Sequence, residues 1–208
     1  MADSTASYGY WSLALFNAVV YSGLVLFFFR PRTLRDCGAF ALFSVFLVAA
    51  FSEMYGFPLT FYLLSDWLQS RYPQIDWLSH DTGHFLDLLI GWKGNPHTGP
   101  MYLLGFAFVA SGFVLMLSAR QALNAAQQRH LPATTGAYAY VRHPQYLGFI
   151  LVMLGFLLQW STLLILVLLL VLTATYVWFA RAEEREALAE FGERYRSYMK
   201  RVPAFVPR

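Results

Sequence analysis

Five long apolar stretches constrain what this chain can fold into more than any other feature. The hydrocarbon core of a bilayer is crossed by about 20 residues of helix, so apolar runs of this kind predict transmembrane helices. The predicted spans are Tyr10–Phe29, Gly38–Phe57, Pro100–Ala119, Pro144–Leu158 and Thr162–Ala180. Only 13% of the 208 residues are charged, against about a quarter in a typical soluble domain. The sequence therefore predicts an all-α, multi-span integral membrane helical bundle that forms a single membrane domain over residues 1–208.

Two of the predicted spans have unusual ends. Gly56-Phe57-Pro58 interrupts the second run, yet the chain stays apolar to Leu68, which leaves a kinked span or a continuing interfacial helix as alternatives. Only Gln159-Trp160-Ser161 separates the fourth run from the fifth, which predicts a tight antiparallel hairpin of neighbouring helices. The fourth run is short for a full crossing, so this hairpin either tilts or ends within the outer interfacial region.

The positive residues predict the orientation of the bundle. Under five spans, thirteen of the fifteen Lys and Arg residues fall on one side, and only Arg71 and Lys93 fall on the other. Because positive residues stay in cytoplasmic loops, we expect an outside N-terminus and a cytoplasmic tail helix, with the active side facing the cytoplasm. In a prokaryote this membrane would be the plasma membrane. The N-terminus has no basic region or cleavage site of a signal peptide, so the first span should be retained. The net charge of +3 is thus topological and does not require nucleic-acid binding.

The first cluster of polar residues with chemical potential lies before the fourth span. Pro144 suits the first position of a helix, which places Arg142 and His143 at its N-terminus. Free backbone N–H groups, the helix dipole and the Arg142 guanidinium together favour an anion there. A carboxylate is the expected ligand.

The second cluster, Glu183-Glu184, lies at the exit of the fifth span. Spacings of four and three place Glu184, Leu188, Phe191, Tyr195 and Tyr198 along one predicted helical stripe. An acid on an inward face needs a cationic or hydrogen-bonding partner, since burying it unpaired is costly. The hairpin brings the two clusters together, so we expect them to form one pocket that suits a zwitterionic ligand with a cationic part.

The order of these motifs carries a family resemblance. The matching elements are His130, Thr135-Gly136-x-Tyr138, Arg142-His143-Pro144-x-Tyr146-x-Gly148, Glu183-Glu184-x-x-x-Leu188-x-x-Phe191-Gly192-x-x-Tyr195-x-x-Tyr198 and Arg201-Val202-Pro203. Together they resemble the isoprenylcysteine carboxyl methyltransferase and phospholipid methyltransferase superfamily. The resemblance covers roughly residues 130–207, whereas residues 1–129 show no motif that assigns a subfamily.

The resemblance implies an S-adenosylmethionine-dependent methyltransferase whose lipophilic acceptor enters from the bilayer. Residues 130–208 would form the cofactor-binding core, and residues 1–129 the substrate-specificity part. The residues implied to line or shape the cofactor site are His130, Gly136, Tyr138, Arg142, His143, Tyr146, Glu183 and Glu184. Among these, Arg142, His143 and Glu184 are the implied catalytic residues. No obligate protein partner is indicated.

Several functions remain open at this stage. The acceptor atom is O, N or S, in an isoprenylcysteine carboxylate, a phospholipid amine or a small lipophilic thiol; His143 could assist an amine, which must first lose a proton. A sterol-type NADPH reductase and a non-enzymatic membrane adaptor are the other classes. The charged residues could also be snorkelling residues at span ends, and the tyrosines an aromatic belt.

Two further features have no assigned role. Glu53 lies within the second span, where it either lines an acceptor tunnel or forms a structural hydrogen bond to the kinked backbone near Pro58. His80, His84 and His97 lie in the outer loop, but Gly83 weakens the helix that a metal-binding histidine pair requires. We therefore expect a solvated loop and no metal. The single Cys37 offers neither an internal disulfide nor a thiolate metal site.

Overall fold

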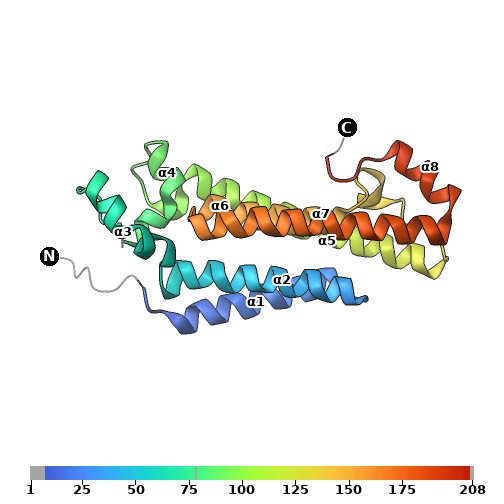
Figure 1. Cartoon of the computed structure of the whole chain (residues 1–208), viewed down its shortest axis with the longest axis horizontal. Coiled ribbons are helices and arrows are strands. Elements are labelled where there is room, and N and C mark those ends of the chain that lie inside the picture. Colours follow the sequence, from blue (N-terminus) through green and yellow to red (C-terminus); the bar gives the residue numbers. More distant parts are fainter. Residues whose placement is uncertain (1–7, 78, 207–208) are drawn as a thin grey trace.

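The computed structural model describes residues 8–77 and 79–206. All regular secondary structure in these residues is helical (Figure 1). The α-helices are α1 (Trp11–Phe29), α2 (Leu34–Phe51), α3 (Leu59–Arg71), α4 (Phe85–Leu89), α5 (Pro100–Gln128), α6 (Pro144–Gln159), α7 (Leu163–Phe191) and α8 (Glu193–Arg201). A π-helix follows α2 at Ser52–Gly56, and short 3-10 helices lie at His80–His84, Pro96–Thr98 and Gly136–Ala139.

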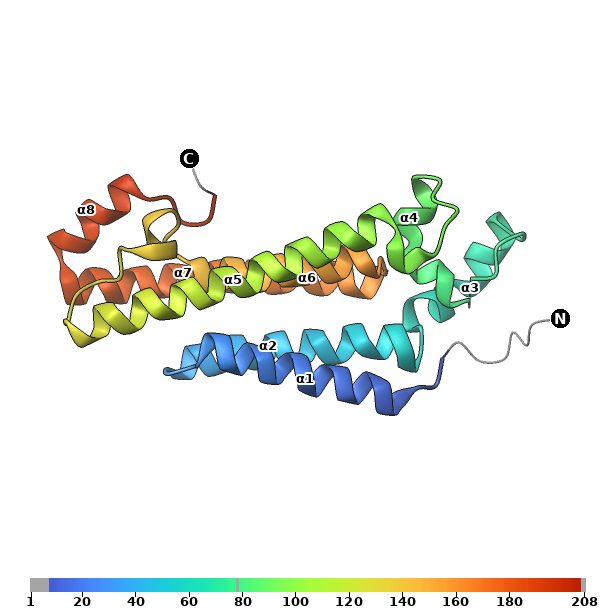
Figure 2. The same cartoon turned by 180° about the vertical axis from the view of Figure 1, so that it is seen from behind.

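The long helices run side by side in two layers, with the α1–α2 hairpin against α5, α6 and α7 (Figure 2). α3 and α4 lie at one end of the bundle, and α8 lies at the other. Four helices are long and apolar enough to cross a membrane: α1, Leu34–Gly56, α5 and α7. α6 is apolar but has 16 residues, about 24 Å of helix. The predicted multi-span bundle is confirmed, with α6 as its short member.

Local sequence signals set the turn between α1 and α2. α1 ends where Arg30 adopts a left-handed conformation, with φ of 50°, before Pro31. α2 begins with a capping box in which the Thr33 hydroxyl accepts from Asp36 N and the Asp36 carboxylate accepts from Thr33 N. This turn carries Arg30, Arg32 and Arg35 at the end of the bundle where α8 lies.

The end of α2 resolves the alternatives for Glu53. The helix loosens into the π-helix, and α3 follows the extended Phe57 and Pro58, so the predicted break is present. The Glu53 side chain is 1% exposed, and its Oε1 accepts hydrogen bonds from Thr60 N and Thr60 Oγ1, each 3.0 Å long. Thr60 Oγ1 also accepts from Leu164 N, at 3.2 Å. Glu53 thus forms the structural hydrogen bond to the kinked backbone and ties α3 to the start of α7.

α5 and α6 pack closely through two pairs of glycines. A β-carbon built on Gly112 would lie 2.6 Å from Gly148 O, and one on Gly155 would lie 2.6 Å from Gly105 O. Such contacts are far below van der Waals distance, so the backbones approach as closely as small residues allow. We call this contact the glycine seam. This contact holds α6 against α5 through the helix backbones, independently of the side chains at the site.

The hairpin tip is buried beneath the segment that joins α3 to α5. The Trp160 side chain is fully buried, and a β-carbon on Gly83 would lie 2.3 Å from its ring. His84 is 1% exposed, with its ring 5.2 Å from that of Trp160 and 4.8 Å from that of His97. The expectation of a solvated loop is therefore wrong at His84, because the loop packs over the hairpin. The His80 side chain lies outside the described residues, which bring no three metal-ligating side chains together.

The predicted continuous stripe from Glu184 to Tyr198 is also wrong. α7 ends at Phe191, and Gly192, with φ of 55°, turns the chain into α8. Tyr195 and Tyr198 are buried on α8, on a different helix axis from Glu184. The turn at Gly192 folds α8 back over the end of the bundle (Figure 1).

Candidate functional site

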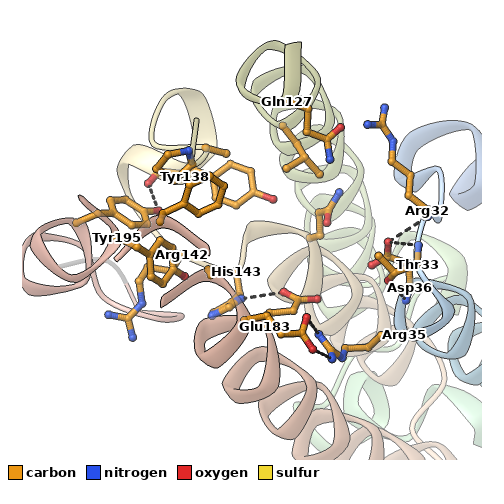
Figure 3. Close-up of a pocket in the computed structure, with 18 of the residues that line it drawn as sticks. Arg32, Thr33, Arg35, Asp36, Gln127, Tyr138, Arg142, His143, Glu183 and Tyr195 are labelled. Carbon is orange, nitrogen blue, oxygen red and sulfur yellow. Dashed lines mark hydrogen bonds and ion pairs between the residues drawn. The ribbon is translucent and has the colours of Figure 1, made fainter. Parts of the chain in front are cut away.

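A cavity of about 240 Å³ lies at the end of the bundle beside α8. Its walls come from both layers: the α1–α2 turn, the end of α5, the segment before α6, the end of α7, and α8 (Figure 3). Residues far apart in sequence, such as Arg32, His143 and Glu183, therefore face one space. This is the end of the molecule to which the sequence assigns the chemistry.

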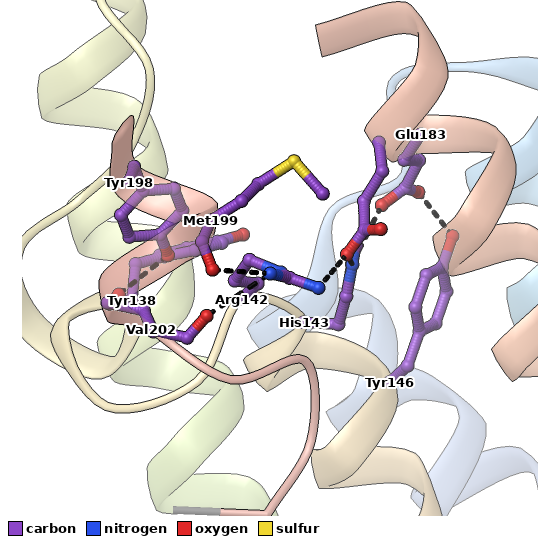
Figure 4. A network of polar contacts seen from close by, with 9 residues as sticks. Tyr138, Arg142, His143, Tyr146, Glu183, Tyr198, Met199 and Val202 are labelled. Carbon is purple, nitrogen blue, oxygen red and sulfur yellow. Dashed lines mark hydrogen bonds and ion pairs between the residues drawn. The ribbon is translucent and has the colours of Figure 1, made fainter. Parts of the chain in front are cut away.

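The two predicted polar clusters meet at this cavity (Figure 4). Glu184 Oε1 lies 2.8 Å from Arg142 Nη2 and 2.9 Å from His143 Nε2. Glu183 Oε2 lies 3.5 Å from His143 Nδ1, and Glu183 Oε1 accepts a hydrogen bond from the Tyr146 hydroxyl. The expectation that the hairpin brings Arg142-His143 to Glu183-Glu184 is confirmed. We call these five side chains the His143 network.

Helix ends explain why these side chains meet. Pro144 occupies the first turn of α6, so Arg142 and His143 lie in the loop immediately before it. α7 continues as a helix well past its predicted apolar stretch, which projects Glu183 and Glu184 alongside that loop. The short connection from α6 to α7 makes the entrance of one helix the neighbour of the exit of the other.

The tail of the chain binds the backbone N–H groups of the two residues that precede α6. Arg142 N donates to Pro203 O at 2.9 Å, and His143 N donates to Ala204 O at 3.2 Å. Arg142 Nη1 donates to the carbonyls of Met199 and Val202, at 3.0 and 3.2 Å. The N–H groups of Arg142 and His143, just before the first turn of α6, are therefore not free to bind an anion. The carboxylate that Arg142 binds is that of Glu184.

Two carboxylates flank the His143 ring. Its side chain is 4% exposed, and its ring packs against Phe205 with the ring centroids 5.6 Å apart. Burial lowers the pKa of His143, but hydrogen bonds and charges from Glu183 and Glu184 outweigh burial and raise the pKa above its ordinary value. With a carboxylate at each ring nitrogen, the surroundings of His143 favour the protonated imidazole over the neutral one.

The remaining predicted site residues lie at different distances from the cavity. Tyr138 lines it, and the Tyr138 carbonyl accepts a 2.6 Å hydrogen bond from the Tyr198 hydroxyl. Tyr146 lies behind the cavity wall, through its contact with Glu183. His130 is exposed at the end of α5, and Gly136 has φ of 58° in a turn against α5. The structure does not bring His130 or Gly136 to the cavity lining.

Sequence reasoning missed the wall that the α1–α2 turn contributes. Arg30, Arg32, Arg35 and Asp36 line the cavity, and Glu186 on α7 forms a bidentate pair with the Arg35 guanidinium. In the sequence these arginines count only among the positive residues that predict the orientation. Positive residues at a span end look alike in sequence whether they face headgroups or a cavity.

Comparisons with known proteins bear on the chemistry of this site. The phospholipid methyltransferase family matches residues 100–194. The protein-S-isoprenylcysteine O-methyltransferase of Schizosaccharomyces pombe is 28% identical over 206 residues, covering 79% of this chain and 87% of the relative. The methanethiol S-methyltransferase of Crocosphaera subtropica is 37% identical over 78 residues, covering 36% of this chain and 28% of the relative. Methanethiol S-methyltransferase 2 of Bradyrhizobium diazoefficiens is 40% identical over 75 residues, covering 34% and 27%. No solved structure gives a significant match.

These matches support the isoprenylcysteine carboxyl methyltransferase and phospholipid methyltransferase superfamily that the motifs resemble. The chain is a membrane methyltransferase. The family match spans α5, α6 and α7, the helices that hold Arg142, His143, Glu183 and Glu184 in place. A methyltransferase requires a methyl donor as well as an acceptor.

Proposed function

We propose that the chain transfers a methyl group from S-adenosylmethionine to the carboxylate of a lipophilic, isoprenylcysteine-like acceptor. The observation that carries this choice of acceptor is His143, whose two ring nitrogens face Glu184 and Glu183 at 2.9 and 3.5 Å. A protonated imidazole offers no base to an amine or thiol, which must lose a proton before it attacks. A carboxylate is already ionised at neutral pH and needs no base.

The donor set around the cavity fits a zwitterionic, partly cationic methyl donor. Glu183 keeps a side chain that is 35% exposed and can pair with an ammonium or accept from hydroxyl groups. Arg142 Nε is buried without a hydrogen-bond partner among the described residues, so one guanidinium donor remains for a ligand. We propose that Arg142, His143 and Glu183 contact the donor, that Glu184 orients Arg142 and His143, and that Tyr138 and Tyr146 shape the site.

The chain would act mainly by alignment and water exclusion. When bound, S-adenosylmethionine supplies an activated methyl group that is transferred in a single in-line displacement, leaving S-adenosylhomocysteine. The His143 network holds Arg142 and Glu183 in fixed positions, so little reorganisation is needed on binding. The Pro203–Phe205 tail packs over Arg142 and His143 and shields them from water.

A small thiol is the second candidate acceptor. The two methanethiol S-methyltransferases support it, since both exceed the Schizosaccharomyces relative in identity, although over a shorter stretch. A thiol has an ordinary pKa near 8.5 and still has to be deprotonated. The carboxylates at both ring nitrogens of His143 favour the protonated imidazole, which disfavours this acceptor and disfavours a phospholipid amine more strongly.

We also propose that residues 130–208 bind the donor, that residues 1–129 select the acceptor, and that the cavity faces the cytoplasm. Lys and Arg residues concentrate on the cavity side of the bundle, which supports this orientation. The test is accessibility labelling of Ser79→Cys and Ser197→Cys, each in a Cys37→Ser background. Labelling of both cysteines from the same side would overturn the orientation.

The acceptor class is tested with the purified protein in lipid nanodiscs and methyl-labelled S-adenosylmethionine. We expect methylation of N-acetyl-S-farnesylcysteine, and little or none of phosphatidylethanolamine or methanethiol. Binding of S-adenosylhomocysteine but not NADPH, measured by calorimetry, tests the donor separately. A second series shortens the prenyl chain, with concentrations expressed per lipid, and turnover should fall as methylene groups are lost, because each contributes about 0.8 kcal/mol to partition. Preferred methylation of methanethiol would establish the thiol reading instead.

A further inference from the structure

Some of the positively charged side chains around the cavity pair with an acidic side chain of the protein, and others do not. Arg142 pairs with Glu184, and Arg35 pairs with Glu186. His143 lies between two carboxylates. Each of these cations therefore already has an acid of the chain as its partner.

Arg30 and Arg32 differ from the other cavity cations. Both line the cavity from the α1–α2 turn, and neither guanidinium forms an ion pair among the residues that the structure describes. The nearby Asp36 carboxylate is engaged with backbone groups, accepting from Arg32 N and Thr33 N at 3.0 Å each. The turn thus presents two guanidinium groups whose charge no side chain neutralises directly.

The Arg32 side chain is also held in position. Its Nη2 donates to the side-chain oxygen of Asn124 on α5, which bridges the two layers at the cavity mouth. Figure 3 shows Arg32 extending from the α1–α2 side toward α5, near Gln127. An amide oxygen orients a guanidinium without cancelling its charge, so the remaining donors stay available.

The wall opposite this turn carries the His143 network. A methyl donor bound there leaves the turn as the wall where an acceptor's head can lie. Two guanidinium groups match a carboxylate in charge and in geometry, whereas they repel an ammonium. They also lie at the end of α1 and α2, where a lipophilic chain attached to that head would remain within the bilayer.

We propose that Arg30 and Arg32 bind the carboxylate of the acceptor and so select an anionic acceptor over an amine or a neutral thiol. This inference rests on the proposed function and assigns its acceptor specificity to the first turn of the membrane domain. Asn124 is a positioning residue, which acts through Arg32.

The test compares Arg30→Gln, Arg32→Gln and the double variant with the unchanged chain in phosphatidylcholine nanodiscs. For N-acetyl-S-farnesylcysteine, the double variant should raise the KM roughly ten- to a hundredfold, the loss expected for charge-assisted hydrogen bonds, with a much smaller change in kcat. Inhibition by the carboxamide analogue should stay unchanged, because that analogue carries no charge. Arg32→Lys should restore part of the affinity, and S-adenosylhomocysteine should bind all variants equally.

Arg129→Gln is the matched control. Arg129 directly follows α5, is exposed and does not line the cavity. It should leave the KM unchanged, which excludes a general effect of surface charge on partition. A KM that stays unchanged in the double variant would overturn the inference while leaving the proposed function intact. A KM that rises only in nanodiscs with phosphatidylglycerol would also overturn the inference and leave the proposed function intact. It would identify Arg30 and Arg32 as lipid anchors. If the unchanged chain binds S-adenosylhomocysteine but does not methylate the carboxylate, both this inference and the proposed acceptor fail.

Discussion

Replacing Glu184 with Gln probes the energetic weight of the His143 network. Gln has nearly the same volume as Glu and keeps an oxygen acceptor, so the substitution removes mainly the charge. The Glu184 and Arg142 side chains are 15% and 13% exposed, and His143 is 4% exposed. Breaking a buried pair by removing one partner costs about 3–5 kcal/mol, and the loss of a charged hydrogen bond costs about 1.5–3 kcal/mol. Because Gln retains an acceptor, we expect a loss of about 3 kcal/mol in the free energy of unfolding.

Glu186→Gln is the matched control on the same helix. Glu186 also pairs with an arginine, Arg35, but its side chain is 68% exposed. Exposed pairs contribute about 0–1 kcal/mol, so this variant should unfold almost as the unchanged chain does. Thermal unfolding of both variants in the same nanodiscs gives the comparison.

The expected ordering can be refuted directly. If Glu184→Gln and Glu186→Gln lose the same stability, the His143 network contributes no more than a surface pair. Binding of S-adenosylhomocysteine should also weaken in Glu184→Gln, roughly ten- to a hundredfold, because Arg142 loses the partner that orients it. Unchanged binding would remove Glu184 from the proposed donor site.

Other measurements test separate parts of the structure. Since the folded-state pKa of His143 is raised, its contribution to stability is full below about pH 6.5 and is lost as the pH rises through that raised pKa. His143→Gln should therefore flatten the fall in melting temperature on the alkaline side, and an unaltered slope would contradict this. Gly112→Ala should destabilise by about 1–3 kcal/mol, because its β-carbon would overlap a carbonyl of α6, whereas Gly23→Ala in open space should not destabilise. Tyr198→Phe removes the hydrogen bond to the Tyr138 carbonyl and should cost about 1 kcal/mol, read from thermal unfolding; no loss would mean that this bond does not hold α8.

Sequence patterns were sufficient to predict the helical bundle and the part of the site in which Arg142-His143 meets Glu183-Glu184. Hydropathy located the spanning helices, and Pro144 with a short connection to α7 was enough to predict that Arg142-His143 meets Glu183-Glu184. These successes share a cause, because each depends on contacts between neighbouring segments of the chain. A tight hairpin leaves few alternatives for which residues of its two helices are neighbours.

The errors arose where the tertiary structure joins distant segments. Backbone carbonyls of Pro203 and Ala204 accept from the N–H groups of Arg142 and His143, and no side-chain motif predicts where a tail carbonyl lies. Helical periodicity places Glu184 and Tyr198 on one stripe, because it does not take into account a single helix-ending residue. Gly192, with its positive φ, ends the helix between them. The cavity wall formed by the α1–α2 turn depends on how two layers dock, which spacing along the chain does not encode.

The glycine seam has a consequence for comparing sequences. Gly105 and Gly112 on α5, and Gly148 and Gly155 on α6, are each seven residues apart, and backbone oxygen lies where their β-carbons would be. A homologous chain with a larger residue at any of these columns of an alignment must hold its two helices farther apart. That widening would displace the N-terminal end of α6 relative to α5, where Arg142 and His143 begin the cavity wall. Glycine at all four columns is therefore a marker, readable without any structure, for chains in which α5 and α6 pack as closely as here.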